Sequence, residues 1–111
     1  MSESYPLELS VQETKRLLDE KAADVVLIDV REPFELETCR IAGAQHIPMR
    51  QIPEHVGTLP KDKHLLIHCH HGGRSLRVTQ FLRANGYDAV SNVAGGIEAW
   101  SLEIDPTVPR Y

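Results

Sequence analysis

The sequence predicts an α/β fold, with a mainly parallel central sheet of about five strands and helices on both faces. Short extended patterns alternate with helical patterns along the chain, which favours parallel strands joined by crossover helices. Two runs, residues 25–28 and 65–67, are continuously apolar, as expected of strands buried on both faces. We therefore expect a buried sheet whose carboxyl edge carries the ligand site, as is usual in such folds.

Length and composition indicate one domain over residues 1–111, with an extended C-terminal tail at about 103–111. A chain of 111 residues with 41% hydrophobic and 25% charged residues can bury a core without disulfides or a metal. The net charge of −4 argues against a nucleic-acid partner. The polar start lacks a signal peptide, and no apolar stretch is long enough to cross a membrane. We expect a cytoplasmic protein that binds neither nucleic acid nor a membrane.

In the first half of the chain, a helix begins at Ser10. Ser10 and Glu13 have the spacing of a capping box, and the apolar pattern fades near Lys21. A short edge strand is expected before it, weakened by Pro6. The other elements follow in order: a strand at 25–28, a short helix at 31–37 with Pro33 in its first turn, an extended piece at 45–47 and a short helix at 52–59.

In the second half, two glycine pairs separate strands from helices. Asn85-Gly86 suits a helix end because these residues adopt the left-handed conformation. Leu76, Val78, Thr79, Phe81 and Leu82 are candidates for burial on the helix that ends there. The elements are a strand at 64–68, a turn at Gly72-Gly73, a helix at 75–85, a strand at 89–93, a turn at Gly95-Gly96 and a helix at 97–102. The prolines after it predict an extended tail.

Three features follow directly after predicted strands: Asp29, Cys69 and the Gly95-Gly96 turn. Since the carboxyl ends of parallel strands share one edge, we expect them on one rim of the sheet. Cys69 stands out among them because a helix begins shortly after it. The positive end of that helix, the cation of Arg74 and inward loop N–H groups would all favour a thiolate there.

The loop around Cys69 is suited to an anion as well as to a nucleophile. Gly72 and Gly73 allow the backbone to form a ring of N–H groups. Arg74 can hold an oxyanion through two hydrogen bonds. A buried cysteine beside a simple glycine turn would not explain this concentration of polar residues. We therefore predict Cys69 as the catalytic residue, with six substrate-binding residues: His70, His71, Gly72, Gly73, Arg74 and Ser75.

Two classes of enzyme use such loops, and the loop length separates them. Protein tyrosine phosphatases have His-Cys, five residues and then Arg-Ser, whereas here four residues lie between Cys69 and Arg74. A phosphoryl group with three equatorial oxygens needs a wide cradle. The smaller ring fits a single extra sulfur atom on the thiolate better.

Several ordered motifs resemble those of the single-domain rhodaneses, a sulfurtransferase family. The similar segments are Asp29 to Glu35, Ile41 to Pro48, the loop Cys69 to Ser75, and Gly95 to Trp100. The resemblance implies a rhodanese-like fold and a two-step mechanism. Cys69 would take a sulfane sulfur from a small anionic donor such as thiosulfate, and cyanide or a thiol would remove it from the Cys69 persulfide. No cofactor other than this covalent intermediate is expected.

The resemblance also leaves open questions. Thiosulfate-using members often have arginine after the cysteine, where this chain has His70. If His70 or His71 contributes charge, donor affinity rises as the pH falls. Asp29 and Arg31 are expected to support the loop. The segment Asp105 to Tyr111 resembles the ends of rhodanese domains fused to adenylylating enzymes of molybdopterin synthesis, so a sulfur-carrier protein or another thiol is a candidate acceptor.

Other readings of the same residues remain as alternatives. A phosphatase or arsenate reductase of related fold is the first, and a non-catalytic interaction module the second. No metal is expected, because adjacent histidines on one short loop rarely form a closed tetrahedral set. Cys39 could act as a resolving thiol, but an ordinary packing role is preferred. Trp100 is expected to anchor the last helix.

Overall fold

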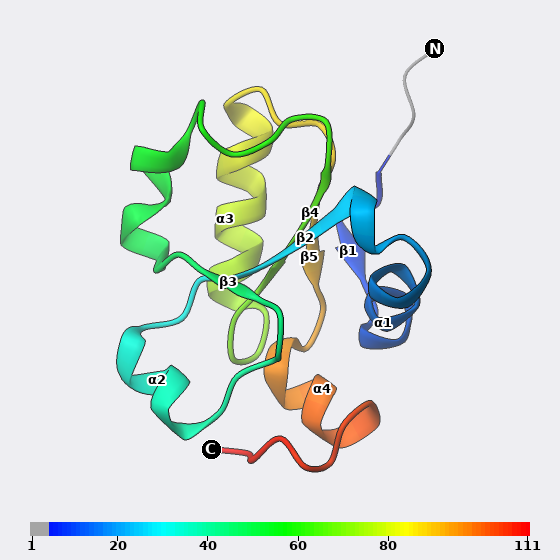
Figure 1. The fold of residues 1–111 in the computed structure, drawn as a ribbon. Helices are drawn as coiled ribbons and strands as arrows, with labels where there is room; N and C mark the ends of the chain where they lie inside the picture. Colours follow the sequence, from blue (N-terminus) through cyan, green and yellow to red (C-terminus); the bar gives the residue numbers. More distant parts are fainter. Residues whose placement is uncertain (1–4) are drawn as a thin grey trace.

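The computed structural model describes residues 5–111 and contains one parallel five-stranded sheet (Figure 1). Its strands run in the order β1-β5-β4-β2-β3. Their bounds are β1 Glu8–Leu9, β2 Val25–Asp29, β3 Gln45–His46, β4 His64–His68 and β5 Val90–Val93. The predicted α/β fold and the five strands are confirmed. β1 is a two-residue strand at one edge, as the neighbouring Pro6 suggests.

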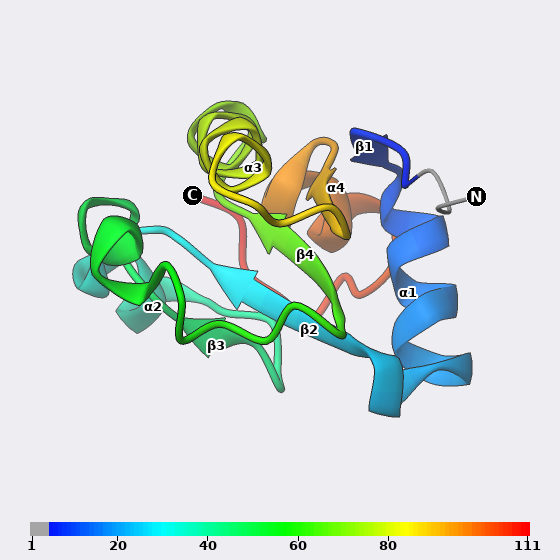
Figure 2. The same ribbon diagram turned by 90° about the horizontal axis from the view of Figure 1, so that it is seen from above.

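The helices lie on both faces of the sheet (Figure 2). Their bounds are α1 Val11–Glu20, η1 Ala22–Asp24, α2 Pro33–Thr38, η2 Met49–His55, α3 Gly73–Ala84 and α4 Gly96–Glu103, where η marks 3-10 helices. α1 and α4 pack together on one face, and α3 and η2 lie on the other. The short helix predicted at 52–59 is η2, which starts three residues earlier and contains Pro53.

Two apolar clusters occupy the two faces of the sheet. Leu65 and Ile67 of β4 pack with α3 and η2, whereas Leu66 packs with α1 and α4. This alternation is the expected consequence of successive strand residues pointing to opposite faces. Trp100 lies in the second cluster and is 6% exposed, which confirms its packing role. Phe81 is 38% exposed, so its predicted burial is wrong; it lines an open pocket between α3 and η2.

The capping of α1 follows the predicted pattern. The Ser10 hydroxyl accepts a hydrogen bond from the Glu13 N–H at 3.1 Å, and the Glu13 carboxylate accepts one from the Ser10 N–H. Such a box satisfies two N–H groups that a helix start otherwise leaves unpaired.

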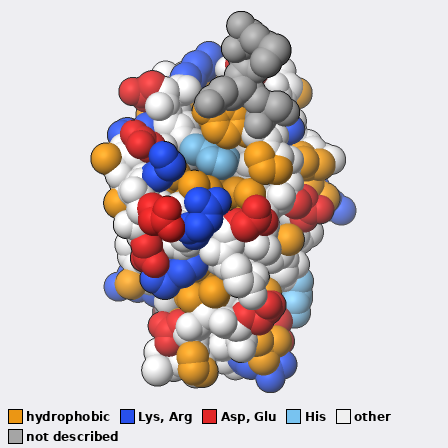
Figure 3. Space-filling model, turned by 90° about the vertical axis from the view of Figure 1, so that its right-hand side faces the viewer, with side chains coloured by type: hydrophobic (Ala, Val, Ile, Leu, Met, Phe, Trp, Pro, Cys, Tyr) orange, Lys and Arg blue, Asp and Glu red, His pale blue; other side chains and the backbone are white. Residues whose placement is uncertain are grey.

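Acidic and basic side chains are interspersed on the side of the molecule that carries α1, with no single-sign field over that face (Figure 3). Among residues 5–111, no helix combines the length and apolar character needed to cross a bilayer.

The carboxyl edge of the sheet brings the predicted site residues together. Asp29 and His68 are register partners in β2 and β4. The N–H groups of Ile97 and Glu98, at the start of α4, donate to the carbonyls of Cys69 and His70 at 2.9 and 3.1 Å. Asp29, Cys69 and the Gly95-Gly96 turn therefore share one rim, as predicted.

Candidate active site

Cys69 follows β4 and is buried on the α3 side of the sheet, with 1% of its surface exposed. Its Sγ accepts hydrogen bonds from the Gly72 N–H at 3.1 Å and the Ser75 N–H at 3.4 Å. The Ser75 hydroxyl lies 3.3 Å from Sγ and also contacts Asn92 Oδ1, so its one proton serves one partner at a time. We call these donors around Sγ the thiol cradle.

The backbone of the loop makes the cradle possible. Gly72 caps α3 with a φ of 111°, a conformation that side chains rarely adopt. Gly96 has a φ of 57°, and a Cβ there would lie 2.4 Å from the Cys69 carbonyl oxygen. The close approach of α4 to the loop thus requires glycine. The carbonyls of Cys69 and His70 thus bond to α4, while the N–H groups of Gly72 and Ser75 contact the sulfur.

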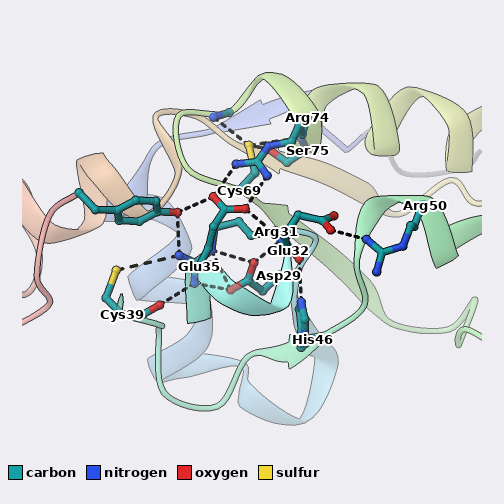
Figure 4. A network of polar contacts seen from close by, with 12 residues as sticks. Asp29, Arg31, Glu32, Glu35, Cys39, His46, Arg50, Cys69, Arg74 and Ser75 are labelled. Atoms are coloured by element: carbon teal, nitrogen blue, oxygen red, sulfur yellow. Dashed lines mark hydrogen bonds and ion pairs between the residues drawn. The ribbon is translucent and has the colours of Figure 1, made fainter. Parts of the chain in front are cut away.

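A second set of residues, the charge network, lies beside the cradle. It consists of Asp29, Arg31, Glu35 and Arg74 (Figure 4), together with Tyr111, whose hydroxyl contacts Arg31 and Glu35. Arg74 donates to both oxygens of Glu35, at 2.7 and 2.9 Å. These bonds lower the pKa of Glu35 to about 2, although burial opposes the shift. The carboxylate is therefore ionised at neutral pH. The sequence predicts that Arg74 holds an oxyanion through two hydrogen bonds. In this structure its two terminal nitrogens donate to Glu35 instead.

Arg31 is fully buried and forms the base of the network. Its Nε and Nη2 donate to the Asp29 carboxylate at 2.7 to 3.1 Å, and Nη2 also donates to the Cys39 carbonyl at 2.8 Å. Burial opposes ionisation of Asp29, but the bonds from Arg31 hold the pKa of Asp29 below its usual value. The pair links the end of β2 to the Cys39 carbonyl after α2, and support of the Cys69 loop by Asp29 and Arg31 stays a prediction.

The histidines on either side of Cys69 differ in environment. His68 is fully buried 3.7 Å from Asp29, and burial lowers its pKa, so its ring is neutral. His70 stacks on His71 and on Tyr111, with ring centroids 3.9 and 3.8 Å apart. Burial and then the neighbouring His71 lower the pKa of His70. His70 therefore gains its charge only at a pH below the ordinary range for histidine.

The structure adds residues to which the sequence analysis gave no role. Glu35 lies within the first rhodanese-like motif, and its acidic side chain in the first turn of α2, at the same rim as Arg74, is the sequence signal for its role. Asn92 of β5 donates to the Gly72 carbonyl at 3.2 Å and accepts from Ser75. Tyr111 comes from the tail, and its aromatic side chain is the only sequence signal that could have suggested a role at the site. Cys39, for which the sequence favours a packing role, is a free, buried thiol in the second apolar cluster, and its Sγ lies 4.0 Å from Arg31 Nη1.

A buried thiol held by backbone N–H groups at a helix start defines a cysteine-loop site that suits a nucleophilic sulfur. The chain belongs to the rhodanese-like domain family, whose profile matches residues 10–103.

It is similar to a sulfurtransferase of Allochromatium vinosum, with 39% identity over 86% of this chain and 87% of the relative. It is also similar to the putative sulfurtransferase YtwF of Bacillus subtilis, with 40% identity over 90% and 98%. The chain spans 30% of a further relative, the Rhodanese-like/PpiC domain-containing protein 12 of Arabidopsis thaliana, to which it is 40% identical over 77% of its own length. The crystal structure of a rhodanese-like domain protein from Staphylococcus aureus superposes with a TM-score of 0.79 at 33% identity, covering 96% of this chain and 99% of the other.

Proposed function

We propose that this protein is a rhodanese-type sulfurtransferase that carries a sulfane sulfur on Cys69. The single observation that carries the proposal is the thiol cradle, in which two backbone N–H groups and a hydroxyl point at Sγ. Donors fixed in this way stabilise a thiolate and an added terminal sulfur without reorganising. The family and the relatives named sulfurtransferase support the same reaction class.

The reaction has two steps. The Cys69 thiolate attacks the outer sulfur of a donor such as thiosulfate, an S–S bond forms to Cys69, and the bond to the sulfonyl sulfur breaks so that sulfite leaves with the electron pair. In the second step the acceptor, cyanide or a thiolate, attacks the terminal sulfur. Thiocyanate or a new persulfide leaves, and the Cys69 thiolate returns.

The arginines around Cys69 are paired with carboxylates, which affects how strongly the site attracts an anionic sulfur donor. Arg74 is bound to Glu35 and Arg31 to Asp29, and Arg110 pairs with Glu98 beside the loop at 2.7 Å. His70 is neutral at pH 7, so the surroundings of Cys69 give a dianion less attraction than an unpaired arginine would. A persulfide on a thiol or on a sulfur-carrier protein is therefore a donor or acceptor to test beside thiosulfate. The proposal places this chemistry in the cytoplasm, where thiols stay reduced.

The experiment is a steady-state assay of thiocyanate formation from thiosulfate and cyanide, followed over both substrates. Parallel lines in the double-reciprocal plots are expected because a covalent sulfur carrier links two half-reactions. The same preparation is offered an aryl phosphate. Hydrolysis of the phosphate, with no sulfur transfer from thiosulfate or from an organic persulfide, would overturn the proposal in favour of a phosphatase.

A further inference from the structure

The segment after α4 returns to the candidate active site and is attached along its length. The Ser101 hydroxyl donates to the carbonyl of Val108, whose side chain is buried in the core. Arg110 then pairs with Glu98 of α4, and Tyr111 follows it. Tyr111 thereby reaches the loop that carries Cys69, where its ring stacks on His70, although the two residues are far apart in sequence.

The hydroxyl of Tyr111 joins two ion pairs. It accepts a hydrogen bond from Arg31 Nη1 at 2.9 Å and donates one to Glu35 Oε1 at 2.8 Å. Burial raises the pKa of Tyr111 to about 12, so the hydroxyl keeps its proton at neutral pH. Glu35 in turn holds Arg74, one residue before Ser75 of the thiol cradle. A continuous chain of hydrogen bonds therefore runs from Asp29 through Tyr111 to Arg74.

The ring of Tyr111 has a separate contact. It stacks on His70 with an interplanar angle of 8° and a centroid distance of 3.8 Å. His71 lies on His70 at 3.9 Å. The residue next to Cys69 is therefore held between two rings, and its Nε2 is buried without a hydrogen-bond partner within the described residues.

We propose that Tyr111 is a positioning residue of the candidate active site: its hydroxyl orients the Glu35–Arg74 pair and its ring orients His70 beside Cys69. This inference rests on the proposed function, because the positioned groups are those that a sulfur donor meets. Tyr111 forms no bond with the transferred sulfur and acts through its neighbours. Its two contacts predict two separable effects.

Two substitutions separate the hydroxyl from the ring. Tyr111→Phe removes the bridge and keeps the stack, so donor KM rises about fivefold while kcat changes less than about twofold, as expected for loss of a hydrogen bond to charged groups that orient the donor. Tyr111→Leu removes both contacts, so donor KM rises further. The pH at which donor KM changes with protonation of His70 also shifts to a higher value. Each variant is measured with thiosulfate and with an organic persulfide.

A second readout does not need sulfur transfer. The ring of His70 is titrated by NMR in the wild type and both variants. His71 of the loop, Glu98 of α4, Glu35 of α2 and Tyr111 all face this ring. Tyr111→Leu exposes it to water, so the pKa of His70 rises toward its ordinary value, whereas Tyr111→Phe leaves it near the wild-type value. If no sulfur transfer is found, the proposed function fails, and this titration still decides whether Tyr111 positions His70.

Tyr87→Phe is the matched control. The Tyr87 hydroxyl also bridges two groups, accepting from the Gly57 N–H at 2.9 Å and donating to the Leu59 carbonyl at 3.0 Å. Tyr87 precedes β5 and so lies at the opposite edge of the sheet from Cys69. Its removal is expected to lower thermal stability and leave donor KM unchanged. The inference is overturned if both Tyr111 variants behave like this control, with stability reduced but donor KM and the His70 titration unaltered.

Discussion

The thiol cradle is assembled from the short segment between Cys69 and Ser75, whereas the charge network beside it joins residues up to 80 positions apart in sequence. The cradle uses mainly backbone N–H groups, which any residue except proline supplies once the loop has its conformation. The network uses particular side chains, and each must arrive from a different element. A substitution that distorts the loop should therefore affect the reaction itself, while one in the network should affect stability and donor binding.

Among substitutions that keep Cys69, the largest effect is expected from Gly96→Ala, which tests the conformation of the cradle. The new Cβ would lie 2.4 Å from the Cys69 carbonyl oxygen and 2.6 Å from that of His70, at a φ of 57°. The free energy of unfolding should fall by about 2–4 kcal/mol, and sulfur loading by about tenfold or more. Urea denaturation and single-turnover loading measure the two effects.

Gly73→Ala is the control for this prediction. Gly73 is the first residue of α3 and, like Gly96, begins a helix at the site, but its φ is ordinary and an added Cβ would meet no atom within 4 Å. The change in unfolding free energy should stay below about 1 kcal/mol, and loading should be preserved. Equal effects of the two alanines would show that the close approach of α4 does not shape the cradle.

The next effect concerns the charge network and appears as a dependence of stability on pH. Hydrogen bonds from Arg74 lower the pKa of Glu35 to about 2, so its contribution is complete above the unfolded value of 4.5 and is lost as the pH falls toward 2. Because the Arg74 side chain is a third exposed, we expect a contribution of about 1–2 kcal/mol.

Glu35→Gln tests this dependence. The difference in unfolding free energy between wild type and variant should shrink between pH 4.5 and the folded pKa of about 2, as followed by urea denaturation at several pH values. A difference that stays constant over this range would contradict the assigned ion pair.

The smallest effect is expected from Ser75→Ala. The variant loses the hydroxyl 3.3 Å from Sγ but keeps the Ser75 and Gly72 N–H groups that also contact the sulfur. Loading should slow by less than about tenfold, since one donor of several is removed. Stopped-flow loading with thiosulfate measures it. Complete loss of loading would mean that the hydroxyl, and not the backbone, defines the cradle.

The same comparison explains what the sequence could predict. The parallel sheet, the helices on both faces and the rim shared by Asp29 and Cys69 were predicted because apolar runs and turn residues are local signals. The position of the cysteine before a helix also indicated the kind of site. These features depend on neighbouring residues, so a single chain carries enough information for them.

The partners within the charge network could not be predicted in the same way. The pairing of Arg74 with Glu35 depends on how α2 packs beside the loop. The contact of Tyr111 with Arg31 depends on the path of the tail after α4. Composition and residue spacing do not show which side chains from distant segments meet in the folded chain. Phe81 was misplaced for a related reason, because its neighbours on α3 did not show which side of the helix faces the sheet.

Intact-mass spectrometry after incubation with thiosulfate, and separately with an organic persulfide, tests the central claim that Cys69 carries the sulfur. Wild type and Cys39→Ser should each gain one sulfur atom that cyanide removes, and Cys69→Ser should gain none. Cys39→Ser is the matched control because Cys39 is the other free, buried thiol. No gain from either donor, or a gain retained in Cys69→Ser and lost in Cys39→Ser, would contradict the account.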